Sequence, residues 1–402
     1  MLLTWLGAKA AFWSSAGVLG YTYAGYPAAI AALARLRPQP PQRAACEPTV
    51  TVVLAAHDEE RVIGRKLDNL LALDYPREKL DIVVVSDGST DRTDAIVAGY
   101  AGRGVTLVRL ATPQGKPVAL NHGVARARGE VILFCDARQR IEPGALRSLT
   151  PWFADPVVGA VSGELSIDDA RGPGLYWRYE KAIRQAESAV DSVPGCTGAL
   201  YAIRRALWRD LPRGCLLDDV FTPMQIVLQG YRVGFEPTAR VFDEETDLEG
   251  EFRRKARTLA GNFQLLAQLP GLLDPRRDRI LPQLVSHKLL RLACPYALAT
   301  LFGSNLVLCA TFAPGWPFYV STLCGQVGLY ALAALEALTG RGGRLGRVSH
   351  TFVVLNLAAV AGLVRYLKGD FAWTSARPEA PAAAAPPAAA PAPAVPAAAA
   401  RG

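Results

Sequence analysis

The sequence has few histidines and none of the spacings that usually hold a structural metal. Its 402 residues include four histidines and seven cysteines, without a C-x-x-C pair or an H-E-x-x-H motif. An odd number of cysteines without paired spacing argues against both a disulfide framework and a zinc site. A reducing cytosolic environment fits these thiols. They are Cys46, Cys135, Cys196, Cys215, Cys294, Cys309 and Cys324.

Glycine-rich phosphate loops are also missing. No G-x-G-x-x-G motif opens the first helix expected in the central region, and no G-x-x-x-x-G-K-[ST] motif occurs. These motifs place backbone N–H groups around a pyrophosphate or a triphosphate. Their absence argues against a dinucleotide-dependent dehydrogenase and against a P-loop NTPase.

Charged residues are scarce over long stretches. They make up 20% of the chain, whereas hydrophobic residues make up 50%, and the formal net charge is +8. The arginines lie beside apolar runs and in helix-like segments instead of one basic block. Anionic lipid headgroups and phosphorylated substrates explain that pattern better than nucleic acid does. We therefore expect membrane lipids, and no nucleic acid, among the partners.

Residues 10–34 form the first of these uncharged stretches. They are rich in alanine, leucine and aromatic residues, and a helix of this length can cross a bilayer. The run is too long for the apolar part of a signal peptide, and no small-residue cleavage site follows it. Arg35, Arg37 and Arg43 come next. We expect an uncleaved helix whose C-terminal end faces the cytosol.

A second uncharged stretch covers residues 292–335. The sequence Ala-Pro-Gly-Trp-Pro at 313–317 interrupts it, and proline and glycine there predict a tight turn. We expect two membrane helices, near 290–313 and 317–338. Three arginines follow in a short loop that should face the cytosol: Arg341, Arg344 and Arg347.

A third apolar run, residues 348–364, is just long enough to cross. One helix before the central region and three after it would put the C-terminus outside. Arg365, Lys368 and Arg377 instead favour the cytosol. One segment is therefore expected to be re-entrant or to lie on the membrane surface, and the basic stretch 276–291 is the candidate for a surface position.

The central region alternates between apolar strands and helices. Strands are expected at 49–56, 80–86, 105–110 and 130–135, and a helical stretch follows each of the first three. Near-continuous apolar strands separated by helices predict an α/β fold with a mainly parallel sheet flanked by helices.

Polar clusters follow three of these strands, at 57–60, 87–91 and 136–138. Ligands of parallel α/β sheets bind beyond the carboxyl ends of the strands. The sequence therefore predicts one ligand site built from all three clusters.

The order of motifs in this region resembles that of family 2 glycosyltransferases. The similarity begins with VVVSDGSTD at 83–91 and covers about residues 48–270. It implies the GT-A fold and transfer of a sugar from a nucleotide-diphosphate donor. Later motifs in the same order are QGK at 114–116, FCDA at 134–137, GCTGALYAIRR at 195–205, LLDDVFTPMQIVLQGYRV at 216–233 and EFRRKARTLAGNFQLL at 251–266.

The resemblance assigns several residues to the donor. Asp87 stands at the place of the family's uracil-binding aspartate, which implies a UDP-sugar. His57 and Glu59 fall within the family's Tyr-Asn-Glu position and, with Lys116, are expected to bind the nucleotide sugar. On local sequence alone, Asp87 could equally cap a turn or a helix.

Asp136 matches the first carboxylate of the family's D-x-D motif, which implies a divalent cation, Mg²⁺ or Mn²⁺, on the donor phosphates. Such a cation takes oxygen ligands and neutralises the charge that develops as the nucleotide leaves. The second carboxylate is replaced by Arg138, which cannot bind a metal but can contact phosphate. Alternatively, Asp136 is a polar cap at the end of a strand.

Asp218 and Asp219 match the family's Glu-Asp pair. Inverting transfer needs a carboxylate that deprotonates the acceptor hydroxyl. By position Asp219 is this base, and Asp218 orients it or raises its pKa as a neighbouring like charge. A helix N-cap is the alternative role for the pair.

Two further segments are assigned to the substrates. The small residues Gly195, Cys196, Thr197 and Gly198 are expected to let an acceptor approach the backbone. Arg254 and Arg257 fall in the family's Q-x-x-R-W motif and are expected to bind the leaving pyrophosphate. Thr258 replaces the tryptophan of that motif, which disfavours processive polymer synthesis. A basic helix resting on lipid headgroups is the alternative for this segment.

The expected organisation has four parts. Residues 1–47 form a transmembrane helix and linker, and residues 48–275 form a cytosolic GT-A domain. Residues 276–377 hold an interfacial helix and about three transmembrane helices. Residues 378–402, rich in alanine and proline, are expected to be disordered. The protein should thus be a multi-pass protein of the cell (inner) membrane.

A transporter and an inactive scaffold are the alternatives to an enzyme that glycosylates a lipid or glycan. A transporter should carry charges inside its membrane helices and repeat them along the chain. The uncharged runs show no such repeat, and they carry no charge apart from Glu336 near one end. An inactive scaffold of the same fold should have lost Asp136 or Asp219, and both are present.

Overall fold

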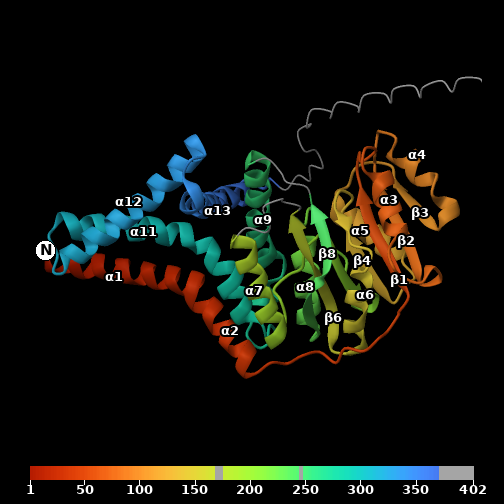
Figure 1. Cartoon of the computed structure of the whole chain (residues 1–402), viewed down its shortest axis with the longest axis horizontal. Coiled ribbons are helices and arrows are strands. Elements are labelled where there is room, and N and C mark those ends of the chain that lie inside the picture. Colours follow the sequence, from red (N-terminus) through yellow and green to blue (C-terminus); the bar gives the residue numbers. More distant parts are fainter. Residues whose placement is uncertain (168–174, 244–247, 371–402) are drawn as a thin grey trace, which may run out of the picture.

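The computed structural model describes residues 1–167, 175–243 and 248–370, in which an α/β body carries a projecting arm of long helices (Figure 1). The predicted tail, 378–402, lies outside the described residues. The α/β body lies at one end of the molecule, and the N-terminus lies at the other end, at the tip of the arm (Figure 1).

Eight strands form one mixed sheet in the order β3-β2-β1-β4-β7-β6-β8-β5. The pairs β3–β2, β2–β1, β1–β4 and β6–β8 are parallel, whereas β4–β7, β7–β6 and β8–β5 are antiparallel. The strands are β1 (Val50–Ala56), β2 (Leu80–Asp87), β3 (Val105–Leu110), β4 (Val131–Cys135), β5 (Arg140–Ile141), β6 (Val158–Ile167), β7 (Leu200–Arg204) and β8 (Arg232–Asp243).

The four strands predicted from the sequence are confirmed as β1 to β4, and all their mutual pairs are parallel. The later strands make the sheet mixed. Helices cover both faces of the body: α3 (Ile63–Leu71), α4 (Thr93–Ala98), α5 (Lys116–Arg126), α6 (Ala145–Leu149), α7 (Leu175–Val190), α8 (Asp218–Leu228) and α9 (Leu248–Gln268). Single turns lie at η2 (Arg77–Lys79), η3 (Ala101–Arg103), η4 (Thr150–Ala154), η5 (Arg205–Leu207) and η6 (Pro270–Leu273).

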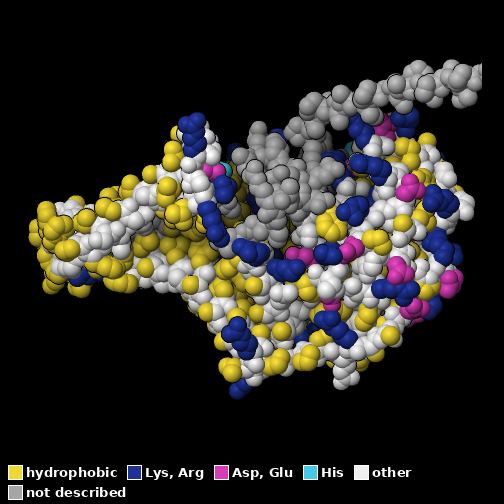
Figure 2. Space-filling view, viewed as in Figure 1, with side chains coloured by type: hydrophobic (Ala, Val, Ile, Leu, Met, Phe, Trp, Pro, Cys, Tyr) yellow, Lys and Arg dark blue, Asp and Glu magenta, His cyan; other side chains and the backbone are white. Residues whose placement is uncertain are grey.

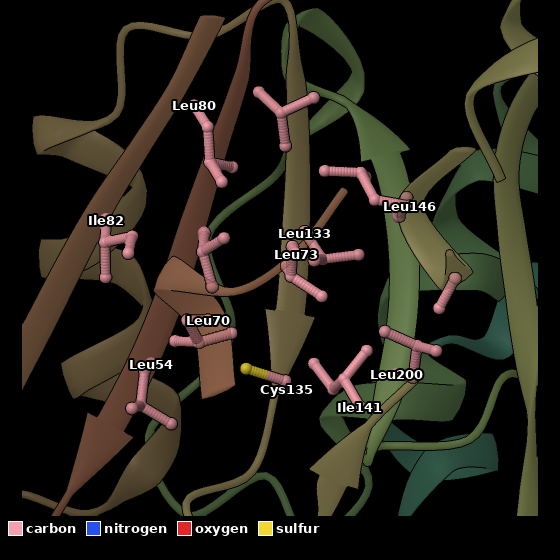
Figure 3. Packing of buried hydrophobic residues seen from close by; sticks show 14 of the residues in the cluster. Leu54, Leu70, Leu73, Leu80, Ile82, Leu133, Cys135, Ile141, Leu146 and Leu200 are labelled. Atoms are coloured by element: carbon pink, nitrogen blue, oxygen red, sulfur yellow. The ribbon is translucent and has the colours of Figure 1, made fainter. Parts of the chain in front are cut away.

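Each face of the sheet has its own apolar core. On one face, Leu54 and Leu133 of the strands pack with Leu70 of α3 and Leu146 of α6 (Figure 3). The other face packs against α5 and α8 through Phe134 and other buried residues. Burying one such side chain fully contributes roughly 1.5–3 kcal/mol. Because both faces are covered, ligands can reach the sheet only at its edges and strand ends.

The arm consists of an N-terminal helix and three later helices. The N-terminal helix is continuous through α1 (Leu2–Gly20), η1 (Tyr21–Gly25) and α2 (Tyr26–Leu36). The later ones are α10 (Leu281–Gln283), η7 (Leu284–Leu289) and α11 (Leu290–Ala310) in one run, then α12 (Trp316–Thr339) and α13 (Gly343–Leu367).

Helices α1 and α11 run antiparallel. The Trp5 indole donates a hydrogen bond to the Thr311 hydroxyl (3.0 Å) at the tip, and Tyr21 bonds Ser286 (2.9 Å) near the body. The turn predicted at 313–317 is present at the tip, where Gly315 has φ +88°. The arm's surface is mostly hydrophobic, whereas Lys and Arg gather where it meets the body (Figure 2).

Three helices of the described chain are long and apolar enough to cross a membrane: Leu281–Ala310, Trp316–Thr339 and Gly343–Leu367. The N-terminal helix is not among them, so its predicted span at 10–34 stays a prediction. Residues 281–289, expected within a separate surface helix at 276–291, instead form the first turns of the first span.

Helix α13 does not return to the tip of the arm. Its C-terminal part packs on α9 of the body, where Tyr366 stacks on Phe263 with ring centroids 5.9 Å apart. A β-carbon added at Gly362 would lie only 2.9 Å from the Ala260 nitrogen. The small side chain at 362 therefore permits a close crossing of the two helices.

We expect Gly362→Leu to separate α13 from α9, because its side chain has no room at this crossing. Overpacking of this kind costs about 1–3 kcal/mol. The measurement is the thermal unfolding midpoint in one detergent. Gly328→Leu on α12 is the matched control, since nothing lies within 4 Å of a β-carbon there. Equal midpoints for the two variants would contradict the close crossing.

Candidate active site

The ends of three parallel strands bring the predicted polar clusters together. Val50 of β1 is in register with Leu80 of β2 and Val131 of β4, so the three strands end at one edge. A cavity of about 310 Å³ opens there. It is lined by His57, Asp87, Pro113, Gln114, Gly115, Lys116, Pro117, Gly214, Cys215, Leu216, Asp218 and Arg257.

Lys116 forms the ionic centre of this cavity. Its Nζ lies 2.9 Å from Asp136 Oδ1 and 3.2 Å from Asp218 Oδ2. Burial alone would lower the pKa of Lys116, but the two carboxylates overcome it and hold that pKa above its usual range. Gly115, at φ +93°, starts helix α5 in a conformation that side chains disfavour. The lysine is thus charged and held in place.

Asp87 is completely buried, and its carboxylate holds a loop. Oδ1 accepts the Gln114 N–H and Oδ2 accepts the Gly115 N–H, each at 2.8 Å. Gly88, at φ +62°, lets this loop approach, since a β-carbon there would lie 2.5 Å from the Pro113 nitrogen. Asp87 therefore has a structural role in holding residues 114 and 115, which differs from the expected cap of its own turn or of the helix that follows. The uracil contact stays a prediction.

His57 lines the cavity, whereas Glu59 and Arg138 are not among its lining residues and pair with each other. His57 Nδ1 is 2.7 Å from the Asp87 carbonyl oxygen. Arg138 Nε donates to both carboxylate oxygens of Glu59, at 3.1 and 3.2 Å. Burial raises the pKa of Glu59, and the arginine charge opposes that shift. Arg138, which replaces the second carboxylate of the D-x-D motif, therefore forms an ion pair with Glu59 of the predicted nucleotide-binding cluster.

Asp136 offers a poor site for a protein-held divalent cation. Its Oδ1 is paired with the Lys116 ammonium, and position 138, where a second carboxylate would stand, carries a guanidinium. Within residues 1–167, 175–243 and 248–370, no group of three His, Cys, Asp or Glu side chains could hold a metal ion. In nucleotide sites Mg²⁺ is usually held by one or two carboxylates together with substrate phosphates and water. Here the candidate carboxylate, Asp136, is already paired with an ammonium. The residues present do not fit the expected metal.

Asp218 and Asp219 are the first two residues of helix α8. The N-cap is Leu217 and no side chain caps the helix, so the N-cap alternative is wrong. The two carboxylates point to different partners. Asp218 pairs with Lys116, whereas Asp219 Oδ2 accepts the Gly198 N–H at 3.0 Å. Burial, and then the charge of Asp218, raise the pKa of Asp219 to about 6. A carboxylate with such a pKa is ionised at neutral pH and is basic enough to accept a proton.

The small-residue segment 195–198 contacts this carboxylate directly. The Cys196 N–H donates to the Asp219 carbonyl oxygen (2.8 Å), and a β-carbon at Gly198 would lie 3.2 Å from Asp219 Oδ2. Gly195 has φ +138°, which favours glycine. The structure thus places the predicted acceptor segment and the predicted base side by side.

Only one of the two predicted pyrophosphate arginines lines the cavity as described. Arg257 of α9 is among the lining residues, whereas Arg254 lies 3.6 Å from Asp243. Helix α9 is fixed to the cavity wall by Gln264, which bonds Leu216 N–H and Gly214 oxygen at 2.9 Å each. The position of Arg257 therefore depends on this amide.

Three residues near the base were missed by the sequence analysis. Arg184 donates to Ser162 Oγ (2.6 Å), and that oxygen accepts the Thr197 N–H (3.0 Å). Lys288 Cε lies 3.4 Å from the position of a β-carbon on Gly195. They belong to no motif, and Lys288 falls in the basic stretch that was assigned to the membrane surface.

A buried ionic network holds Lys288 in place. Its neighbour His287 faces Glu187 through Nδ1 (2.9 Å) and Glu180 through Nε2 (3.1 Å). Arg291 also pairs with Glu180, at 2.6 Å, and Tyr26 donates to Glu187 at 2.5 Å. Helix α7 of the body is thus joined to both α2 and the first span of the arm.

A sheet of this order, with carboxylates and cations gathered at the ends of its parallel strands, defines a GT-A glycosyltransferase fold. Residues 51–211 match the family model described as glycosyl transferase family 2, as the resemblance of the sequence motifs predicted.

Curated relatives support this assignment. The chain is 28% identical over 266 residues to a probable glycosyltransferase of Bacillus subtilis, covering 58% of this chain and 60% of the relative. It is 28% identical to the beta-monoglucosyldiacylglycerol synthase of Synechocystis (46% and 42% covered). It is 26% identical to the poly-beta-1,6-N-acetyl-D-glucosamine synthase of Staphylococcus aureus (54% and 55% covered). The chain spans about half the length of these relatives.

One solved structure resembles nearly the whole chain. A mannosyltransferase from Pyrobaculum calidifontis, in complex with GDP-Man and Mn²⁺, is 26% identical. The TM-score is 0.70, and the match covers 89% of this chain and 98% of the other. The likeness therefore extends beyond the GT-A domain to the helices of the arm.

We expect Asp87→Asn to weaken the binding of both UDP and GDP, because an amide cannot accept both loop N–H groups. Leaving a buried donor unpaired costs about 1–3 kcal/mol. Isothermal titration with each nucleotide is the measurement. Asp81→Asn, on the same strand, is the control. A selective loss of UDP would instead support the predicted uracil contact.

Proposed function

We propose that this protein is an inverting glycosyltransferase that moves a sugar from a nucleoside diphosphate to an acceptor hydroxyl at a membrane. The observation that carries the proposal is the position of Asp219, a buried carboxylate with a pKa raised to about 6. It directly follows Asp218 of the cavity lining and accepts the N–H of Gly198 in the 195–198 segment. A scaffold without activity would not need that arrangement.

The transfer is a single displacement at the anomeric carbon. The acceptor oxygen forms a bond to this carbon while its proton passes to Asp219. The bond to the diphosphate oxygen breaks on the opposite face, and the electron pair leaves with the nucleotide. Arg257 and Lys116 line the cavity in which that negative charge grows. Cations placed there stabilise the transition state more than the ground state.

For the donor we propose a UDP-sugar, on the resemblance at Asp87. The two oxygens of that carboxylate already accept loop N–H groups, and the Pyrobaculum neighbour is a complex with GDP-Man. A binding assay should therefore include both nucleotides. The predicted Mg²⁺ or Mn²⁺ is left out of the transfer step, because Asp136 and its surroundings do not fit it.

For the acceptor we propose a lipid, glycosylated once or a few times. The relatives include a synthase of a glucosyldiacylglycerol and a synthase of a polysaccharide. Thr258 bonds the Arg254 carbonyl oxygen within α9, at 3.0 Å, and offers no aromatic face to a growing glycan. A polysaccharide acceptor is the alternative, and the size of the product distinguishes the two.

We further propose that the arm spans a cell membrane with the body in the cytosol. The N-terminus and the uncharged turn 311–315 lie at the tip, whereas Arg341, Arg344 and Arg347 follow the opposite end of α12. Positively charged loops favour the cytosol. Because α13 ends on α9, the described end of the chain lies on the body side, so three crossings by α1, α11 and α12 agree with Arg365 and Lys368 at that end.

We expect Asp219→Asn to lower transfer by about 10²–10⁴-fold, because the acceptor then loses its base. Nucleotide binding should survive, since Asp219 lies outside the described cavity lining. Release of UDP or GDP from a panel of nucleotide sugars, with membrane lipid extract as acceptor, is the measurement. Exposed Asp210→Asn serves as the matched control.

The pH profile gives a second readout for the same assignment. A base with a pKa of about 6 is protonated below that pH, so wild-type transfer should decline as pH falls through 6. Removing the like charge with Asp218→Asn should move the decline to lower pH. A decline that stays in place in this variant, or full activity of Asp219→Asn, would remove Asp219 as the base.

For the topology, we expect a C-terminal green fluorescent protein fusion to fluoresce and alkaline phosphatase inserted at 311–315 to be active in a bacterial host. The first reports a cytosolic C-terminus and the second an external tip. A phosphatase fusion at the C-terminus that is active would contradict the cytosolic assignment, and would restore α13 as a crossing helix.

A further inference from the structure

Two side chains distinguish this cavity from a site built for a divalent cation. The first is Arg138, which stands where the family motif has its second carboxylate and pairs with Glu59 at 3.1 Å. The second is Lys116, whose ammonium bridges Asp136 and Asp218. Asp136, the carboxylate of the D-x-D motif that this chain keeps, is thus already paired with the ammonium of Lys116.

The charges around the donor position can be compared directly. A divalent cation supplies two positive charges to the diphosphate. Lys116 and Arg257 together also supply two, and both line the cavity. A metal within bonding distance of Asp136 Oδ1 would lie close to the Lys116 ammonium, and like charges in a partly buried site repel strongly.

Resting on the proposed function, we propose that this transferase stabilises its departing nucleoside diphosphate with fixed protein cations, chiefly Lys116, and does not require a divalent metal ion. Lys116 is well suited to the role. Its side chain is only 16% exposed, and it begins helix α5, whose N-terminal end favours negative charge.

The chemistry of the step is unchanged by this assignment. The sugar–diphosphate bond breaks with its electron pair on the phosphate oxygen, and the acceptor proton goes to Asp219. The negative charge that appears on the leaving group faces Lys116 and Arg257 in place of a metal ion.

The first test compares the wild-type protein in excess EDTA with the protein in Mg²⁺ or Mn²⁺. We expect transfer rates within about twofold of each other. Electron paramagnetic resonance should detect no Mn²⁺ bound by the protein and UDP or GDP together beyond what the nucleotide binds alone. Loss of transfer in EDTA by tenfold or more, restored by Mg²⁺ or Mn²⁺, would overturn the proposal.

Two variants sharpen the test. Arg138→Asp restores a second carboxylate, so we expect it to bind Mn²⁺ with the nucleotide and to become metal-dependent. Arg140→Asp, an exposed neighbour with the same charge change, is the matched control and should stay independent of metal. Metal dependence in neither variant, or in both, would contradict the role given to position 138.

Lys116→Met removes the proposed cation. Loss of one such stabilising group costs about 10²–10³-fold in kcat, which we expect for this variant in EDTA. Near wild-type transfer by Lys116→Met in EDTA would overturn the inference. Isothermal titration with UDP and GDP separates this failure from a failure of the proposed function. Nucleotide binding with EDTA-sensitive transfer rejects only the metal-free mechanism, whereas no binding of either nucleotide rejects the transferase itself.

Discussion

The ion pairs of Lys116 are the interaction on which the rest of the site depends. The lysine begins α5, Asp136 follows β4 and Asp218 begins α8, so one ammonium joins three elements far apart in the sequence. A buried charge is tolerated only when it is paired, and removing one partner leaves the other uncompensated. The same array holds the donor cavity open and sets Asp219 next to a like charge.

The mixed sheet explains how donor and acceptor groups meet. Its parallel half ends at one edge, which places Asp87 in the cavity lining and Asp136 beside Lys116 of that lining. Strand β7 runs antiparallel to β4, so it begins at the same edge and the preceding segment 195–198 reaches Asp219. The antiparallel strand therefore supplies the acceptor side that a purely parallel sheet would lack.

Much of this was accessible from the sequence, because strands β1 to β4 are continuous apolar runs and their polar clusters follow at once. The grouping of Lys116, Asp136 and Asp218 could be expected only through the family resemblance. Lys288 and Arg184 could not be found, since neither belongs to a motif and each reaches the site by tertiary packing. The packing of α13 on α9 could not be predicted either, because the apolar composition of α13 suits a helix that crosses a bilayer as well as one that does not.

Helix α9 connects the membrane arrangement to the chemistry. Its Arg257 lines the cavity, its Gln264 fixes the cavity wall, and its Ala260 touches Gly362 of α13. On the other side of the base, Lys288 belongs to the first turns of a span and approaches Gly195. Both walls of the site are thus continued by helices of the arm. The side of the site next to Gly195 is therefore bounded by Lys288 and by the ion pairs of its neighbour His287 with Glu180 and Glu187, where the arm joins the body.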